Sequence, residues 1–534
     1  MKVILEKTYS KKVGISHRKK YAQFFTPEEV AEIMTDWVLK NKTLNKVLEP
    51  AFGLGVFSRL LLNKKPNLDI KGFDVDPVIF EEANNSFSDF PNVNLILEDY
   101  LFNDWNNKYD GILCNPPYFK FHDYENKKAL DEIKKRLKVN LNGFTNIYTL
   151  FLLKSIYQLS EGGKAAYIIP SEFLNSDYGT FVKRYLIKSK ALKHIIIFDF
   201  KENIFDDALT TSAILLLSKD NSSSNVSFST IGDRQQFEKI KKQIKSDKTE
   251  LHSKTINNKD LDPNIKWRAY YQKQLSKKYK NLVPFKKVAK VVRGIATGAN
   301  IYFTFNQEKA NKLNIPKNSL LPCITKSKDV SSPFFTTERF EELVSANANI
   351  YLFNAGKNPT DNNVLNYIKL GEEEGIHKKF LTSRRTPWFI NENRPPSPIW
   401  VSVFNRNSVK FIRNEAEISN LTTFHCIYLK SDLFSSIDVD LLFAYLLTDI
   451  AKEIFSDNRR EYGDGLRKFE PNDLNNGLML NLSLLSEEEK SDIKILYHSY
   501  RKSVIEDREN KYHLEQIEMI LKKKYEAEQS AKRQ

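Results

Sequence analysis

The sequence predicts an α/β fold: a Rossmann-like domain in the first half of the chain, then a second, mixed α/β domain and a helical C-terminal tail. Short β-rich runs alternate with longer helical patterns over residues 46–217, which is typical of a mostly parallel sheet covered by helices. The chain of 534 residues is long enough for at least two domains. Beyond residue 486 it becomes strongly charged, with apolar residues at helical spacing.

The strands of the first domain are expected at seven runs: residues 46–48, 70–73, 95–97, 109–114, 164–169, 194–198 and 212–218. A helix over 55–62 follows a glycine-containing loop after the first run. In a fold of this kind the active site lies at the carboxyl ends of the strands. Functional residues are therefore expected where each run ends.

Composition divides the chain into four expected segments. Residues 220–225 turn to Ser and Asn, and residues 233–262 are dense in Lys and Gln, which favours a linker with helical pieces. We expect a catalytic domain over 1–220, a connector over 221–284, a second domain over 285–485 and a charged tail over 486–534. Apolar residues in the tail predict one or two amphipathic helices that pack on the body or on a partner: Ile493, Tyr497, Tyr500, Val504, Leu514, Ile517 and Leu521.

The charge and the cysteines limit the classes of protein. Lys and Arg number 82 against 67 Asp and Glu, a formal charge of +15 that attracts a polyanion, although a general Lys and Asn bias is an alternative explanation. Cys114, Cys323 and Cys426 lack metal-ligand spacing, so no metal is expected and a reducing compartment is favoured. No apolar stretch approaches the roughly 20 residues of a membrane span, and no signal peptide is evident, so we expect a soluble, cytoplasmic protein.

The segment Asn115-Pro116-Pro117-Tyr118 directly follows a predicted strand. Two prolines supply no N–H and force the chain out in an extended conformation. The Pro116 carbonyl and the Asn115 amide oxygen can then accept both hydrogens of an amino group in the plane of a base, while the Tyr118 ring stacks on that base. Two such acceptors favour a pyramidal, more nucleophilic nitrogen in the transition state. The alternative for the segment alone is a rigid turn.

A glycine-containing loop follows the first predicted strand, within Val47-Leu-Glu49-Pro-Ala51-Phe-Gly53-Leu-Gly55. Its glycines allow the backbone to approach a ligand closely, and the Glu49 carboxylate suits a cationic amino acid moiety.

Acidic residues follow the next two predicted strands. Asp74 and Val75 end the second, where a carboxylate can bind both ribose hydroxyls of a nucleoside. Asp99 and Tyr100 follow the third, where Asp99 can accept from an adenine amino group and Tyr100 can cover the ring. A nicotinamide dehydrogenase shares the loop and the acid but has no use for the Asn-Pro-Pro-Tyr corner.

Together these motifs resemble the gamma class of N6-adenine DNA methyltransferases from bacterial restriction-modification systems. The segment 22–27, which contains Gln23 and Thr26, is similar to the family's tenth motif, 167–174 to its sixth, and 203–214 to its eighth. The resemblance implies a class I S-adenosylmethionine-dependent methyltransferase domain with S-adenosylmethionine as cofactor. It implies cofactor binding by Thr26, Glu49, Ala51, Gly53, Gly55, Asp74, Val75, Asp99 and Tyr100. It places the target adenine at Asn115, Pro116, Pro117 and Tyr118, with Phe205 as an aromatic contact on the flipped base.

In the second half, two segments resemble the target-recognition domain of the same family. Arg293 and Thr297 lie in the segment that is similar to its opening, and Arg467 and Lys468 lie in one similar to its end. Between them come further cations interleaved with aromatic residues: Arg384, Arg385 and Arg394. Such residues can reach phosphates or base edges of DNA, and their alternative is a solvated or core-packed surface.

The expected function is transfer of a methyl group to a flipped adenine in a short duplex DNA sequence, as the modification enzyme of a restriction-modification system. Expected partners are double-stranded DNA and a separately encoded cognate endonuclease, and a monomer is favoured over a dimer. The alternatives are an RNA or protein glutamine N-methyltransferase, or the methylating part of a combined enzyme. The large basic second half favours DNA, and only about twenty residues precede Gln23, which leaves no room for a nuclease there.

Overall fold

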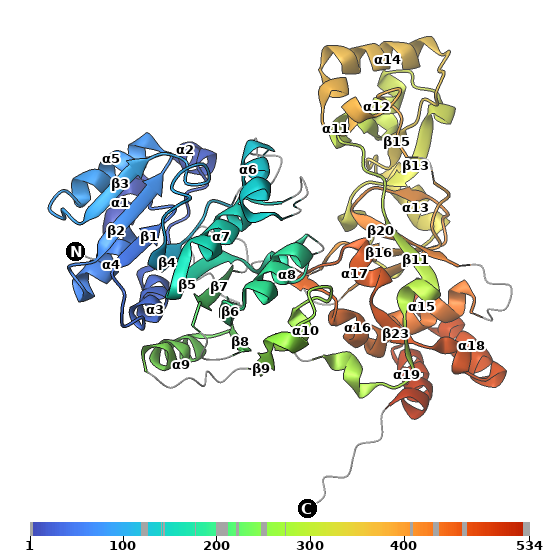
Figure 1. Cartoon of the computed structure of the whole chain (residues 1–534). Coiled ribbons are helices and arrows are strands. Elements are labelled where there is room, and N and C mark those ends of the chain that lie inside the picture. Colours follow the sequence, from blue (N-terminus) through green and yellow to red (C-terminus); the bar gives the residue numbers. More distant parts are fainter. Residues whose placement is uncertain are drawn as a thin grey trace, which may run out of the picture. The chain divides into compact units, whose positions relative to one another are not determined.

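The chain forms two compact units, one up to Lys273 and one from Gln274 onward. A computed structural model describes residues 4–118, 127–139, 141, 145–176, 178–198, 212–220, 224–246, 254–272, 274–392, 394–405, 409–430, 437–461 and 467–526. Figure 1 colours the first unit from blue to green and the second from green to red.

The first unit is built on one sheet with the strand order β3-β2-β1-β4-β5-β7-β6-β8-β9. Strands β3, β2, β1, β4 and β5 are parallel neighbours, and β7 is antiparallel to both β5 and β6. The strands are β1 (Lys46–Glu49), β2 (Asp69–Asp74), β3 (Val93–Leu97), β4 (Tyr109–Cys114), β5 (Leu159–Pro170), β6 (Leu192–Phe198), β7 (Ser212–Ser218), β8 (Asn225–Ile231) and β9 (Lys254–Asn257). All seven predicted strands are therefore confirmed. The strand order reverses at β1, so a ligand crevice is expected beside β1 and β4.

Helices cover both faces of this sheet (Figure 1). One apolar cluster joins one face to α6, α7 and α8, and a second joins the other face to α3, α4 and α9. The helices of the unit are α1 (Ile4–Lys12), α2 (Ile15–Lys20), α3 (Glu28–Leu39), α4 (Val56–Lys64), α5 (Pro77–Ser86), α6 (Lys127–Leu137), α7 (Ile147–Gln158), α8 (Gly179–Ser189), α9 (Arg234–Lys245) and α10 (Arg268–Tyr271). Helix α7 buries every residue except Tyr157, so it is a core helix and not an amphipathic surface helix.

The predicted connector over 221–284 is wrong for residues 225–257. Strand β8 pairs with β6, and β9 pairs with β8, so both extend the sheet of the first unit. Helix α9 between them buries only Phe237, Ile240 and Ile244 and exposes most of its Lys and Gln residues. A polar helix on the edge of a sheet has the composition of a linker, which explains the error.

The described residues of the second unit form four small sheets and nine α-helices. A five-stranded sheet has the order β11-β20-β16-β18-β14, and a four-stranded sheet the order β12-β15-β13-β19. Two smaller sheets have the orders β10-β23 and β17-β22-β21. The strands are β10 (Leu282–Pro284), β11 (Ala289–Arg293), β12 (Thr304–Phe305), β13 (Leu320–Ile324), β14 (Phe334–Phe335), β15 (Tyr351–Phe353), β16 (Ile399–Ser402), β17 (Phe404–Asn405), β18 (Phe411–Asn414), β19 (Ser419–Asn420), β20 (Phe424–Leu429), β21 (Arg460–Glu461), β22 (Arg467–Lys468) and β23 (Leu478–Leu480). The predicted mixed α/β character of this region is confirmed.

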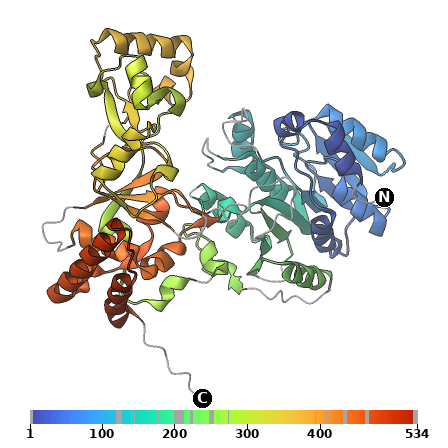
Figure 2. The same ribbon diagram turned by 180° about the vertical axis from the view of Figure 1, so that it is seen from behind.

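The second unit contains the helices predicted for the C-terminal tail. They are α11 (Asn300–Phe303), α12 (Gln307–Lys312), α13 (Thr337–Ser345), α14 (Asn362–Glu373), α15 (Val439–Leu447), α16 (Asp449–Ser456), α17 (Pro471–Asn475), α18 (Glu487–Ile505) and α19 (Tyr512–Tyr525). Helices α18 and α19 lie side by side in both ribbon views (Figures 1 and 2). They bury Ile493, Tyr497 and Ile517 in one cluster with α15, so the tail packs on the body of its own unit. Among the residues placed by the structure, no helix is long and apolar enough to cross a membrane.

Candidate active site

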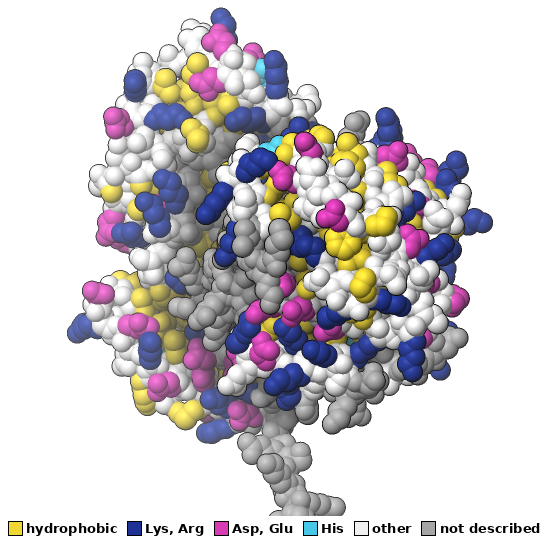
Figure 3. All heavy atoms as spheres, turned by 90° about the vertical axis from the view of Figure 1, so that its left-hand side faces the viewer, with side chains coloured by type: hydrophobic (Ala, Val, Ile, Leu, Met, Phe, Trp, Pro, Cys, Tyr) yellow, Lys and Arg dark blue, Asp and Glu magenta, His cyan; other side chains and the backbone are white. Residues whose placement is uncertain are grey.

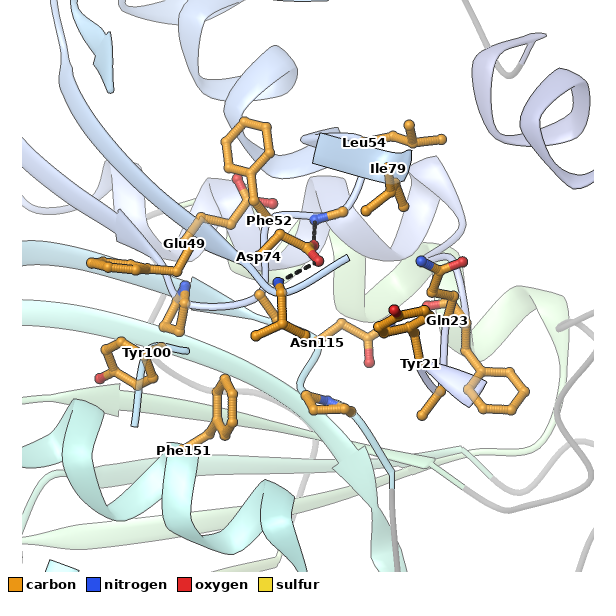
Figure 4. Close-up of a pocket in the computed structure, with 18 of the residues that line it drawn as sticks. Tyr21, Gln23, Glu49, Phe52, Leu54, Asp74, Ile79, Tyr100, Asn115 and Phe151 are labelled. Carbon is orange, nitrogen blue, oxygen red and sulfur yellow. Dashed lines mark hydrogen bonds between the residues drawn. The ribbon is translucent and has the colours of Figure 1, made fainter. Parts of the chain in front are cut away.

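A cavity of about 310 Å³ lies at the carboxyl ends of four neighbouring strands of the first unit (Figure 4). Glu49 ends β1, Asp74 ends β2, Asp99 follows β3 and Asn115 follows β4, and all four line the cavity. The predicted site residues that the cavity brings together are Thr26, Glu49, Ala51, Gly53, Asp74, Val75, Asp99, Tyr100, Asn115 and Pro117. Gly55, Pro116 and Tyr118 lie beside it without lining it, and Phe205 falls outside the described residues.

The loop between β1 and α4 shapes one wall of the cavity. Gly53 has φ +55° and its N–H donates to Asp74 Oδ2 (2.9 Å). Gly55 has φ +71°, and a Cβ there would lie 2.6 Å from ring carbons of Phe52 and Phe87. Gly53 is therefore required for the shape of the cavity, whereas Gly55 is required for the packing of the loop against Phe52 and Phe87.

The Asp74 carboxylate organises the turn after β2. Its Oδ1 accepts from the N–H groups of Val75 (2.8 Å) and Asp76 (3.0 Å), and its Oδ2 accepts from Gly53, as the dashed lines of Figure 4 mark in part. Burial raises the pKa of Asp74, while the N–H groups act in the opposite direction. Oδ1 already accepts two donors, but Oδ2 accepts only one and has room for another, so Asp74 can still bind a hydroxyl group of a ligand.

Glu49 is a buried carboxyl group with unused hydrogen-bonding capacity. Its side chain is 1% exposed, and Ser58 Oγ donates to its Oε2 (2.5 Å). Its Oε1 has no hydrogen-bond partner among the described residues. Burial raises the pKa of Glu49 to about 8. A buried carboxylate needs a partner, so this site fits the cationic amino acid end of a ligand such as S-adenosylmethionine.

Tyr100 closes the far wall of the cavity. The ring is 1% exposed, and its hydroxyl donates to Gln158 Oε1 (2.6 Å) and lies 2.9 Å from Ser155 Oγ. Both partners belong to the core helix α7, which also contributes Phe151 to the lining. Aromatic rings in these positions fit the flat ring of a nucleoside.

The Asn115 amide is held in one orientation at the mouth of the cavity. Its Nδ2 donates to the Phe24 carbonyl (2.8 Å) and to Thr26 Oγ1 (3.0 Å). Because both donors are used, the amide oxygen must face the other way. The Tyr118 hydroxyl lies 2.6 Å from that oxygen and 2.9 Å from the Ile168 carbonyl. The sequence predicted Asn115 Oδ1 as a free acceptor, whereas here it already has one donor within reach.

Several residues that line the cavity were not identified from the sequence. Glu6, Tyr21, Gln23 and Phe24 come from the segment before α3, and Figure 4 shows Tyr21 and Gln23 beside Asn115. Phe24 also faces the Tyr118 ring, with 6.0 Å between centroids and 21° between planes. Gln23 and Phe24 lie within the segment 22–27, which resembles the family's tenth motif. Their place in that motif was the sequence signal that could have identified them as cavity residues.

A buried carboxylate fixes this N-terminal segment to the rest of the unit. Asp76 accepts from Gln23 Nε2 (2.6 Å), and His17 Nε2 lies 2.8 Å from the same oxygen. Asp76 also caps α5 by accepting from the Val78 N–H. The segment thus forms a wall of the cavity because it is anchored at the start of α5.

In the second unit, the predicted DNA-binding residues whose side chains the structure describes have several different partners. Arg293 (2.9 Å) and Lys468 (2.5 Å) both pair with Glu470, and Arg394 pairs with Glu392. Arg384 stacks on the ring of Phe380 at 3.8 Å. The side chain of Arg467 lies outside the described residues.

Two of these residues, Arg385 and Thr297, form hydrogen bonds within their own unit. Arg385 Nη1 donates to the Thr297 carbonyl (3.0 Å) and to Asn391 Oδ1 (3.1 Å). Thr297 is 1% exposed, and its hydroxyl donates to Asn300 Oδ1 (2.5 Å). Because its side chain is buried and already bonded, Thr297 presents no free hydroxyl to DNA in this structure.

On the face seen in Figure 3, Lys and Arg side chains are scattered with carboxylates among them, so charge does not single out one surface on that face. A binding surface must therefore be argued from particular residues.

Two family models match the chain. Residues 33–205 match the Eco57I restriction-modification methylase, and residues 268–513 match the C-terminal domain of the Type II methyltransferase M.Eco57I. The Type II methyltransferase M.AccI of Acinetobacter calcoaceticus is 58% identical over 522 residues, which cover 98% of this chain and 96% of that protein. M.XamI of Xanthomonas campestris pv. amaranthicola is 20% identical over 84% of this chain and 83% of its own length.

Solved structures show the same fold. The Type IIL restriction-modification enzyme MmeI in complex with DNA has a TM-score of 0.56 at 12% identity, covering 98% of this chain and 73% of that chain. The DrdV–DNA complex also has a TM-score of 0.56 at 12% identity, covering 93% of this chain and 58% of that chain.

Proposed function

Because the chain belongs to the family of Type II restriction-modification methyltransferases that includes M.AccI and the Eco57I methylase, we propose that it methylates N6 of adenine at a short sequence in duplex DNA. Its cofactor is S-adenosylmethionine. The observation that carries the choice of an amino group as target is the Asn115 amide, whose fixed Nδ2 leaves Oδ1 as the acceptor. An exocyclic amino group supplies the hydrogens that this oxygen accepts.

In this proposal, different residues of the cavity bind different parts of the cofactor. S-adenosylmethionine supplies a methyl group bound to a positively charged sulfur, which makes the carbon electrophilic. Glu49 binds the amino acid end through its unused Oε1, and Asp74 binds the ribose hydroxyls. Asp99 accepts from the adenine amino group of the cofactor, and Tyr100 covers its ring. The backbone of Ala51, Gly53 and Val75 and the side chain of Thr26 complete the site.

The target base occupies the corner after β4. The Asn115 amide oxygen and the Pro116 carbonyl accept the two N6 hydrogens, and Pro117 fixes the chain so that Tyr118 stacks on the base. The Tyr118 hydroxyl must leave Asn115 Oδ1, or share it, when the base enters. The adenine has to be extruded from the duplex, because N6 cannot be reached in line while the base is stacked and paired. We propose Phe205 as a further contact on the base.

The second unit recognises the sequence in this proposal. Residues 285–485 correspond to most of the part that matches the M.Eco57I C-terminal domain, and we propose that Arg293, Arg384, Arg394, Arg467 and Lys468 contact DNA there. The pairs that Glu470 forms with Arg293 and Lys468 would set those cations in place for phosphates. A separately encoded endonuclease is the proposed counterpart, and the enzyme acts as a monomer on chromosomal DNA in the cytoplasm.

The substrate class is tested by transfer of labelled methyl from S-adenosylmethionine to three acceptors: duplex DNA of varied sequence, RNA duplexes of the same sequences, and protein extract. We expect label in DNA only, confined to one sequence context. Label in RNA or in protein, with none in DNA, would refute the proposal and favour the corresponding alternative. Cofactor binding, measured by calorimetry on the same sample, shows that an inactive result does not come from an unfolded enzyme.

A further inference from the structure

Two neighbouring segments of the second unit expose large apolar side chains. We name them the exposed loop pair: residues 298–301, which end in α11, and residues 378–384. Ile301 is 93% exposed and Phe380 is 58% exposed. At Gly298, which has φ +80°, a Cβ would lie 2.8 Å from Leu381 Cβ, so the two segments touch. Exposed apolar surface of this kind is unfavourable in water and marks interaction sites.

Hydrogen bonds and packed aromatic rings hold the exposed loop pair in place. Arg385 joins the two segments, because its Nη1 donates to the Thr297 carbonyl (3.0 Å) and its Nη2 to the Ala296 carbonyl. Directly after Ile301, the Tyr302 and Tyr367 hydroxyls each donate to the other residue's carbonyl, at 2.9 and 2.7 Å. Their rings stack with centroids 4.6 Å apart. The exposure of Ile301 is therefore imposed by a packed, hydrogen-bonded platform.

The charge of the exposed loop pair is positive. Lys378, Lys379 and Arg384 are exposed, and residues 376–390 contain no Asp or Glu. None of these three cations forms an ion pair with another described residue. Of the flanking acids, Glu372 accepts from Trp388 Nε1 and Glu392 pairs with Arg394, while Glu373 and Glu374 are exposed just before the segment. The Arg384 guanidinium lies 3.8 Å from the centre of the Phe380 ring, so a cation and an aromatic ring are presented together.

We propose that the exposed loop pair is a surface that contacts the recognition sequence in duplex DNA, with Lys378, Lys379 and Arg384 on backbone phosphates and Ile301 and Phe380 on bases. Charge complementarity favours DNA over a protein partner, since residues 376–390 carry cations beside the exposed apolar side chains and contain no acid. Apolar side chains contact thymine methyl groups in the major groove, or wedge between base steps in the minor groove. This inference rests on the proposed function.

Substitution of Ile301 tests the contact to bases. The probe is a duplex oligonucleotide with the context in which the wild type deposits methyl, together with duplexes that alter one base pair each. We expect I301A to lower kcat/KM on the first duplex by roughly tenfold and to weaken discrimination at one position, as loss of one base contact does. The matched control is I495A in α18, where Ile495 is 61% exposed. Wild-type kcat/KM and discrimination in I301A would overturn the inference.

Salt dependence tests the contacts to phosphates. For K379A and for R384A, the slope of log binding constant against log salt concentration should fall by about 0.9 in magnitude per lost phosphate contact. The control K523A removes an exposed lysine from α19 and should leave the slope unchanged. Unchanged slopes for K379A and R384A, or changes in self-association in place of DNA binding, would overturn the inference while leaving adenine methylation intact. A wild type that methylates no DNA would overturn the proposed function as well.

Discussion

Asn115 is oriented by atoms that lie about ninety residues away in the sequence. Its Nδ2 donates to the Phe24 carbonyl and to Thr26 Oγ1, so the segment before α3 decides which way the amide oxygen points. An amide oxygen that points at the target nitrogen is the acceptor on which the proposed mechanism depends. The role of Thr26 therefore extends beyond lining the cofactor cavity.

Replacing Thr26 by Val removes one of the two acceptors of the Asn115 amide and keeps the shape of the side chain. We expect T26V to lose about 1 kcal/mol of orienting interaction, which corresponds to a fall in kcat of about fivefold at saturating cofactor. T26S retains the hydroxyl and should restore most of the rate. Equal kcat in T26V and wild type, measured in single-turnover methyl transfer, would exclude this role for Thr26.

Glu49 couples cofactor binding to proton release. Because burial raises its pKa to about 8, Glu49 is mostly protonated at pH 7 in the empty cavity. A bound cation favours the carboxylate, so binding should expel close to one proton, and affinity should rise as pH increases from 6 to about 7.5. Above that range the cofactor's own amino group loses its charge, with a pKa of roughly 7.7–8.0.

Calorimetry in buffers of different ionisation enthalpy measures this proton directly. The slope of binding enthalpy against buffer enthalpy should be near one proton for the wild type and near zero for E49Q. The matched control is E98Q, because Glu98 also lines the cavity but is exposed. Proton release that persists in E49Q, or an affinity that falls as pH rises toward 7.5, would contradict the assignment of Glu49.

At the scale of elements, the turn from β1 into α4 joins cofactor binding to the packing of the sheet. Both of its glycines adopt positive φ, at +55° for Gly53 and +71° for Gly55. A Cβ on Gly53 would meet only Ile79 Cδ1, at 3.9 Å, whereas a Cβ on Gly55 would collide with the rings of Phe52 and Phe87 at 2.6 Å. A side chain at Gly53 would therefore cause backbone strain alone, whereas a side chain at Gly55 would cause strain and a steric collision.

Alanine substitutions at these glycines should have different effects. G53A carries mainly the strain of a left-handed residue, about 1–2 kcal/mol, and should weaken cofactor binding because the methyl group enters the lining. G55A adds overpacking to the same strain, so its free energy of unfolding should fall by about 3 kcal/mol in total. Urea denaturation compares the two, and equal losses of stability would contradict the packing described for Gly55.

The elements that could be predicted from the sequence are those that bury continuous apolar runs. Strands such as Ser212–Ser218 are buried at every residue, and their composition alone indicates a strand. Strand β9 is only four residues long and has no buried residue, and α9 buries three of twelve. Their place in the sheet depends on pairing with β8 and on packing against it, which no local pattern reveals.

At the scale of the whole molecule, the order of the functional motifs could be predicted because each follows one strand of a parallel sheet. Glu49, Asp74, Asp99 and Asn115 therefore meet at one cavity as expected. The contacts of the N-terminal segment could not be predicted, since Asn115 and Phe24 are 91 residues apart. In the second unit, Arg385 was expected on DNA but binds backbone carbonyls of its own loop. The sequence identifies a cationic side chain, but it does not show which hydrogen-bond acceptors lie near that side chain in the fold.

The central claim is that the cavity of the first unit and its Asn115 corner methylate N6 of adenine in DNA. The most direct test is nucleoside analysis of duplex DNA after incubation with S-adenosylmethionine and either the wild type or N115A. The account predicts N6-methyladenine with the wild type, and none with N115A even though that variant still binds the cofactor. N4-methylcytosine or 5-methylcytosine as the product, or full N6-methyladenine formation by N115A, would contradict it.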